Sequence, residues 1–270
     1  MSPPLPLEVL DHIFDDLFQE KETLKTCCVL SKSWVPYVRR HLFHTIKFNS
    51  HIKPPIELWT NAFPDPSNSP AHHTRALTLE GLPTVAAAVT HSHAYIRTFR
   101  YILELKLASM THEGPVQFSL VPLHGFSPNL KSLSLNLPAP SQELLDLVCS
   151  FPSLENLDLD VRSTNDGTIA DEWKAPSNSP TLAGSLELHG KICSIARKLL
   201  DLPNGLHPVQ IRMVCDAELA SLMNDLLLKC SDTLESLYIG FRSRSGVYSS
   251  AFIVDQHLTA THVPRHSATV

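Results

Sequence analysis

The chain has 270 residues, a formal net charge of −5, 43% hydrophobic residues and 18% charged residues. This composition excludes a disordered chain, and the lack of an apolar run of about 18 residues argues against a membrane protein. A pI near 6.3 argues against a general nucleic-acid binder. The 9 glycines, against 21 prolines, argue against a glycine-rich nucleotide loop and hence against a nucleotide cofactor.

The cysteines and the N-terminus indicate a reducing compartment. The six cysteines include no Cys-x-x-Cys pair, and the sequence has no Asn-x-Ser/Thr acceptor site. The start, Met1-Ser2-Pro3-Pro4, lacks the basic residues and apolar stretch of a secretory signal. We therefore expect a cytoplasmic or nuclear protein with free thiols.

The first 48 residues predict three short helices. Apolar residues recur at helical spacing after Pro6, then between Leu24 and Leu30, and again between Trp34 and Phe43. Ser31-Lys32-Ser33 is a candidate turn and cap before the third helix. Three helices of this length cannot bury all their large side chains among themselves, so we expect some apolar surface to face another protein.

This segment resembles an F-box over roughly residues 4–48. The resemblance rests on Leu5-Pro6-x-Glu8-Val9-Leu10-x-x-Ile13-Phe14-x-x-Leu17 and then Leu24-Lys25-Thr26-Cys27-Cys28-Val29-Leu30-Ser31-Lys32-Ser33-Trp34. The ending Arg39-Arg40-His41-Leu42-Phe43-His44-Thr45-Ile46-Lys47-Phe48 is similar to the version common in fungal proteins, whereas the loop between Phe18 and Thr23 is slightly longer than the pattern.

An F-box implies docking onto the Skp-family adaptor of SCF ubiquitin ligases and, through it, onto a cullin. By motif position, the resemblance implies that the docking surface is formed or supported by Leu5, Pro6, Leu10, Ile13, Leu17, Leu30 and Trp34. The alternative is that these side chains simply form a small helical core.

Residues 49–70 are proline-rich and are interpreted as a linker, and leucine alternations recur along residues 71–241. If Leu77, Leu105, Leu133, Leu157, Leu186, Val209 and Leu237 are equivalent, the steps between them are 28, 28, 24, 29, 23 and 28 residues. These steps fall within the period of about 20–29 residues that is typical of leucine-rich repeats. Prolines or turn residues precede most of the predicted strands.

Helices are expected between the strands. Ser141 and Asp216 are candidate N-caps, and the stretch from Lys191 to Leu202 is a third helical segment. The predicted fold is therefore a mixed α and β class, α+β or α/β. It joins a three-helix unit to an irregular solenoid of about seven strands, with a curved parallel sheet and helices on the convex side.

In each predicted strand the leucines point inward and the residues between them face the concave surface. The candidate recognition residues are Thr78, Glu80, Glu104, Lys106, Ser132, Ser134, Asn136, Asn156, Asp158, Asp160, Glu187, His189, Gln210, Arg212 and Tyr238. Acids outnumber bases five to two in this set, which favours a basic or hydrogen-bonding protein partner. The alternative is an ordinary solvated sheet face.

Motifs for catalysis and metal binding are weak. His72-His73 and His91-x-His93 lack a companion Cys/His pair at structural spacing, so we expect no metal site. The glycines do not form a phosphate loop, and neither Gly-x-Ser-x-Gly nor His-Glu-x-x-His is present. We expect no enzyme activity and no cofactor.

The leucine pattern stops after residue 241. Within residues 242–270, the segment from Val247 to Val254 is rich in β-formers and predicts one last strand. An irregular cap or tail is expected after it. Together, these features lead us to expect a substrate-recognition adaptor of an SCF-type ligase, or alternatively a repeat scaffold that acts outside any ligase.

Overall fold

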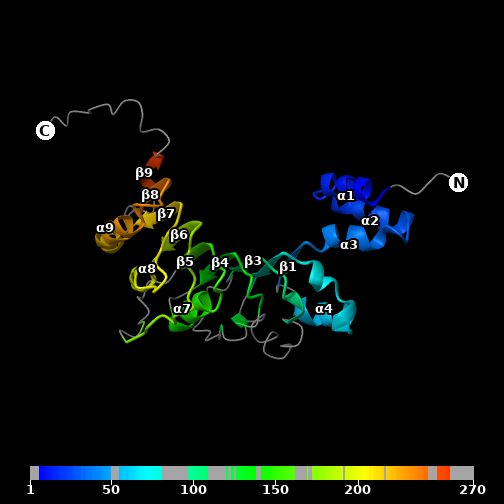
Figure 1. The fold of residues 1–270 in the computed structure, drawn as a ribbon, viewed down its shortest axis with the longest axis horizontal. Helices are drawn as coiled ribbons and strands as arrows, with labels where there is room; N and C mark the ends of the chain where they lie inside the picture. Colours follow the sequence, from blue (N-terminus) through cyan, green and yellow to red (C-terminus); the bar gives the residue numbers. More distant parts are fainter. Residues whose placement is uncertain are drawn as a thin grey trace.

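The computed structural model describes residues 6–49, 55–80, 97–108, 120, 123, 124, 126–137, 141–161, 169, 172–190, 192–215, 217–242 and 248–255. In these residues the chain forms an α/β protein, in which three N-terminal helices precede one sheet of nine strands in the order β1 to β9 (Figure 1). Strands β1 to β8 are parallel, and β9 runs antiparallel to β8. The predicted fold class is confirmed, and the arrangement is consistent with a leucine-rich-repeat solenoid.

The three N-terminal helices are α1 (Leu7–Asp16), α2 (Lys21–Leu30) and α3 (Val35–Leu42). They pack around a small core of Leu10, Phe14, Leu24 and Val38. An ion pair of 3.0 Å between Arg40 Nη2 and Asp11 Oδ1 also joins α3 to α1. The predicted serine cap of α3 is wrong, because Trp34 occupies the N-cap position while the hydroxyls of Ser31 and Ser33 hydrogen-bond to each other at 2.8 Å.

In strands β2 to β7 buried residues alternate with exposed or half-exposed ones, as the leucine pattern predicts. Their bounds are β1 (Thr45–Asn49), β2 (Ala76–Glu80), β3 (Glu104–Ala108), β4 (Ser132–Leu137), β5 (Asn156–Val161), β6 (Ser185–Gly190), β7 (Gln210–Cys215), β8 (Ser236–Arg242) and β9 (Tyr248–Asp255). Inward side chains of neighbouring strands lie next to one another and form a continuous apolar row across the sheet, here called the ladder. The strand register pairs its members in the order Ile46, Leu77, Leu105, Leu133, Leu157, Leu186, Ile211 and Leu237. The last strand, β9, is the one predicted from the β-forming segment near residue 250.

One predicted equivalence is wrong. The residue of β7 that aligns with Leu186 and Leu237 is Ile211, not Val209. Ile211 is fully buried, whereas Val209 is 38% exposed and lies in the turn before the strand. The connection that leads into β7 is longer than the one that leads into β4. The buried Leu206 precedes Ile211 by five positions, whereas the buried Leu130 precedes Leu133 by three.

Helices cover the outer side of the curved sheet. Figure 1 shows α7 (Gln142–Cys149), α8 (Cys193–Leu200) and α9 (Ala217–Cys230) along the convex side of the arc. The predicted cap of α7 is confirmed, because the Ser141 hydroxyl accepts a hydrogen bond from the backbone N–H of Leu144 at 3.3 Å. The predicted cap Asp216 lies outside the described residues. Among the helices in the described segments, none has the length and apolar content needed to cross a membrane.

The junction between the helices and the sheet differs from the expectation. Thr45–Asn49, which crosses the predicted boundary between the first unit and the linker at residue 48, forms β1 and pairs along β2. The expected linker contains α4 (Pro55–Ala62), in which the centre of the Trp59 ring lies 5.7 Å from that of Phe48 and 6.0 Å from that of Phe43. Because β1 pairs along β2 and its Phe48 packs against α4, the repeat array begins at β1.

Three histidines lie at this junction, and burial lowers the pKa of each. The pKa of His73 is lowered to about 4, first by burial and then by the neighbouring His72 ring and Arg75 guanidinium. The pKa values of His41 and His44 are also lowered, mainly by burial. The folded chain therefore keeps these rings neutral at pH values where the unfolded chain protonates them.

We expect the stability of the protein to fall on mild acidification. Above the unfolded-state pKa of about 6.5, neither state binds a proton at His73, so its contribution to the free energy of unfolding is constant. Between pH 6.5 and about 4 the unfolded state binds the proton first, and we expect a loss of about 1–2 kcal/mol from this partly exposed group. Urea unfolding at pH 7.5 and at pH 5.0 measures this loss in the free energy of unfolding. His73→Gln should reduce the difference between the two pH values, and the exposed His207→Gln is the control. An unchanged difference in His73→Gln would contradict this assignment.

Candidate functional site

The exposed and half-exposed residues of strands β1 to β8 form three parallel rows across the concave face of the sheet. The first row, at the strand starts, consists of Thr45, Ala76, Glu104, Ser132, Asn156, Ser185, Gln210 and Ser236. The second row consists of Lys47, Thr78, Lys106, Ser134, Asp158, Glu187, Arg212 and Tyr238. The third row includes Asn49, Glu80, Ala108, Asn136, Asp160 and His189. These rows are fixed by the register, since residues two apart in a strand face the same side.

All fifteen candidate recognition residues lie in these three rows, and the ten that we single out from the sequence for substrate binding lie in the second and third rows. Six of them share the second row, namely Lys106, Ser134, Asp158, Glu187, Arg212 and Tyr238. The other four lie in the third row, namely Glu80, Asn136, Asp160 and His189. The structure therefore brings residues from seven repeats onto one surface.

A groove of about 430 Å³ runs along the first two rows between β1 and β6. Its polar lining consists of Thr45, Thr78, Glu104, Lys106, Ser132, Ser134, Asn156, Asp158, Ser185 and Glu187. Three carboxylates and one ammonium group thus face the groove, which leaves it with a negative charge. Such a surface favours cationic side chains and hydrogen-bond donors in a bound partner.

Two polar lining residues, Thr45 and Ser185, are absent from the predicted recognition set. Thr45 is absent because the sequence pattern places β1 in the helical unit. Ser185 precedes Leu186 as Ser132 precedes Leu133, but the predicted set does not extend to the first position of β6. The backbone N–H and the hydroxyl of Ser185 both donate to Asn156 Oδ1, at 2.8 and 3.0 Å. Extending the alternation of β6 by one residue toward the start of the strand identifies Ser185.

Hydrogen bonds across the strands hold the polar side chains in place. The Ser134 hydroxyl donates to Asp158 Oδ2 at 2.8 Å, and the Asn136 amide donates to Asp160 Oδ2 at 2.9 Å. At the β1 end, Lys47 Nζ lies 2.7 Å from Glu80 Oε1. These contacts orient an acceptor oxygen of Asp158 in the groove and those of Asp160 and Glu80 beside it.

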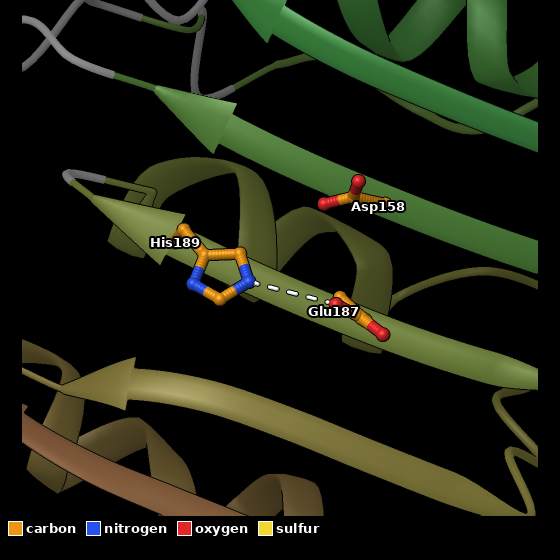
Figure 2. A group of neighbouring side chains, drawn as sticks. All are labelled: Asp158, Glu187 and His189. Carbon is orange, nitrogen blue, oxygen red and sulfur yellow. Dashed lines mark ion pairs between the residues drawn. The ribbon is translucent and has the colours of Figure 1, made fainter. Parts of the chain in front are cut away.

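The densest group of charged side chains lies on β5 and β6. Figure 2 shows Asp158, Glu187 and His189 on the same face, with an ion pair of 3.7 Å between His189 Nε2 and Glu187 Oε2. Arg212 Nη1 lies 3.6 Å from the same carboxylate oxygen, and the Arg212 guanidinium lies 5.6 Å from the centre of the Tyr238 ring. Two carboxylates, an imidazole and a guanidinium thus converge beside the groove.

A second surface lies on the three-helix unit. Of the eight exposed large apolar side chains in the described residues, four belong to α1 and α2: Val9, Ile13, Val29 and Leu30. Val9 and Ile13 are four residues apart and share one face of α1. Leu30 is 72% exposed, and Val29 beside it is 86% exposed. These exposed apolar residues are candidates for contact with another protein.

The residues predicted for adaptor docking divide between this surface and the helical core. Ile13, Leu30 and Pro6 are exposed, whereas Leu10 is buried. Leu17 and Trp34 are partly buried and pack against the core. Leu5 lies outside the described residues. Val9 and Val29 are not in the predicted set, although both belong to the sequence runs on which the resemblance rests.

The remaining nucleophile and metal candidates lie elsewhere. Burial raises the pKa of the Cys149 and Cys230 thiols to about 11, so both stay protonated at neutral pH. The His72 and His73 rings lie 3.9 Å apart at the helix–sheet junction, and His91-x-His93 lies outside the described residues.

Comparison with models of protein families and with curated proteins gave no match for this sequence.

Proposed function

We propose that the chain is a substrate-recognition adaptor of an SCF-type, cullin–RING ubiquitin ligase. The F-box resemblance of the N-terminal run supports the adaptor role, and the polar concave face supports the recognition role. The single observation that carries the proposal is that Ile13 and Leu30, two of the predicted docking residues, are exposed on a three-helix unit whose core is already complete without them.

The docking half of the proposal rests on the energetics of exposed apolar side chains. An exposed large apolar side chain has about 1.5–3 kcal/mol to gain from full burial, so Val9, Ile13, Val29 and Leu30 together favour association with an apolar partner surface. The Skp-family adaptor is the partner that the F-box resemblance implies. A cullin would be reached through that adaptor, without contact by this chain.

The recognition half rests on the concave face. The groove carries Glu104, Asp158 and Glu187 against Lys106, so its proposed target is a protein segment with basic or hydrogen-bond-donating side chains. In this role the chain holds a target protein near the ubiquitin-charged enzyme and catalyses no covalent step itself. We therefore propose that it is not an enzyme and that it acts in ubiquitin-dependent degradation in the cytoplasm or nucleus.

Binding of the full chain to a purified Skp-family adaptor tests the docking half. We expect Ile13→Asp combined with Leu30→Asp to weaken binding by about a hundredfold or more, because each change places a charge in an apolar interface at a cost of about 2 kcal/mol. Isothermal titration calorimetry of the intact and variant chains measures this loss.

Leu228→Asp is the matched control, since Leu228 is 74% exposed on α9, in the repeat region. It should bind the adaptor like the unaltered chain. Equal binding by the double variant, or failure of the intact folded chain to bind, would overturn the docking assignment. The latter result would favour the repeat scaffold acting outside any ligase. Point variants are preferred to deletion of residues 1–48, because that deletion also removes most of β1.

A further inference from the structure

Asp158, Glu187 and His189 occupy neighbouring positions on two parallel strands. Asp158 on β5 lies directly opposite Glu187 on β6, and His189 follows Glu187 by two residues, so all three side chains project from the same face (Figure 2). Their carboxylate oxygens and imidazole nitrogen lie within 4.8 Å of one another. Glu187 and His189 are neighbours on the same face of β6, and the strand register brings Asp158 of β5 beside them.

The donor set and its spacing suit a divalent transition-metal ion. Zinc binds imidazole nitrogen at about 2.0–2.1 Å and carboxylate oxygen at about 2.0–2.2 Å in tetrahedral geometry, so two of its ligand atoms lie about 3.4 Å apart. The 3.7 Å between His189 Nε2 and Glu187 Oε2 is within about 0.3 Å of that separation. The donor atoms all lie within 4.8 Å of one another, so side-chain rotations that bring a ligand atom closer by up to about 1.4 Å complete the site.

The electrostatics around these donors also favour a cation. Like charges directly opposite each other on neighbouring strands repel, and Asp158 faces Glu187 in this way. Asp160 lies opposite His189 and adds a third carboxylate to the same strand pair. Arg212 is the nearby cation, but its 3.6 Å contact with Glu187 is longer than a hydrogen bond, and its side chain is 45% exposed.

The surrounding residues orient the ligands. The Ser134 hydroxyl holds one oxygen of Asp158 at 2.8 Å, which is the kind of outer contact that fixes a carboxylate for metal binding. The three side chains are each half-buried beside the groove, so an ion bound by them would keep water-filled coordination positions directed toward solvent.

We propose that Asp158, Glu187 and His189 form a zinc-binding site on the concave face of the sheet. Glu187 and His189 supply one oxygen and one nitrogen from β6, Asp158 supplies an oxygen from β5, and water completes the coordination. Binding of the ion displaces the Arg212 guanidinium from Glu187. This inference does not depend on the proposed adaptor docking, because the site is separate from the three-helix unit, although Asp158 and Glu187 also line the proposed recognition groove.

Titration of the metal-free full chain with Zn²⁺, followed by calorimetry, tests the site. We expect one Zn²⁺ whose affinity falls at least about tenfold in His189→Ala and in Glu187→Gln, since loss even of an outer-sphere partner costs about 10–100-fold. Arg212→Ala should bind Zn²⁺ more tightly than the unaltered chain, because it removes the competing charge. Co²⁺ in place of Zn²⁺ should give a visible absorption band that His189→Ala lacks.

The matched control is His207→Ala, which removes an exposed imidazole from a turn between α8 and β7. It should leave the affinity unchanged, and circular dichroism of each metal-free variant verifies that the fold is retained. The proposal is overturned if the intact chain takes up no Zn²⁺. It is equally overturned if His189→Ala binds like the unaltered chain, or if His189→Ala and His207→Ala lower the affinity to the same extent.

Discussion

Replacing Leu133 with aspartate is expected to abolish the cooperative unfolding of the repeat array. Leu133 lies in β4 at the middle of the sheet, is fully buried, and stands between Leu105 and Leu157 in the ladder. An unpaired carboxylate there costs several kcal/mol or more, which is comparable to the whole stability of a domain of about 5–15 kcal/mol. The milder Leu133→Ala should retain the fold and lose about 2–5 kcal/mol.

The adjacent Ser132→Asp is the control for the strand register. Ser132 faces the groove and lies opposite Glu104, so we expect a loss of no more than about 1 kcal/mol from like-charge repulsion. Thermal unfolding followed by circular dichroism compares the variants. Because a register shift of one residue exchanges the two faces of a strand, a stable Leu133→Asp beside an unfolded Ser132→Asp would refute the described register.

A second large effect is expected at Gly190, the last residue of β6. Its φ is +82°, and a Cβ built there would lie 1.9 Å from the backbone oxygen of Val161 on β5. Gly190→Ala therefore combines left-handed backbone strain of about 1–2 kcal/mol with a clash against a neighbouring strand. We expect a total loss of about 3–5 kcal/mol, measured as the shift in the urea midpoint.

Gly205 provides the matched control, because it has a similar φ of +77° but lies beside a flexible side chain. The atom nearest to a Cβ added at Gly205 would be Nε2 of the exposed His207, at 3.0 Å, and that ring can move away. Gly205→Ala should therefore lose only the strain of about 1–2 kcal/mol. If both alanine variants lose the same stability, the close approach of β5 and β6 at Gly190 is wrong.

Much of the fold could be predicted because the repeat has a strong physical signal. Each strand needs inward apolar residues at alternating positions, and leucines at such positions recur through Leu77, Leu105, Leu133, Leu157, Leu186 and Leu237. The pattern fails at β7, where the longer turn after Leu206 moves the strand by two residues. A spacing rule assumes a constant turn length, whereas packing requires only that the apolar side chains align.

The start of the array is harder to predict. Ile46 and Phe48 are two alternating apolar residues, which is too short a pattern to distinguish a strand from the end of the preceding helical segment. What places them in the sheet is pairing with β2 and the packing of Trp59 on Phe48. Both contacts join residues that the sequence separates with a proline-rich segment.

For the candidate site on the concave face, too, one part of the arrangement could be predicted from the sequence and another part could not. Alternation alone is enough to predict that Asp158, Glu187 and His189 face away from the core, because side chains in a strand alternate between its two sides. The equivalence of Leu133, Leu157 and Leu186 further predicts that Asp158 lies opposite Ser134 and Glu187, as the strand register confirms. It does not predict that Glu187 lies opposite Arg212, because the longer turn before β7 shifts that strand by two residues.

By itself, then, the sequence determined that this protein has a short helical unit, a leucine-based parallel sheet and a polar face made from the residues between the leucines. Those properties are local, because they depend on side-chain periodicity within each segment. The tertiary structure decided where the array begins, which residues of β7 join the ladder, and which polar side chains of β7 meet those of the neighbouring strands. These depend on strand register, which is set by the packing of buried side chains from repeats about 24–31 residues apart.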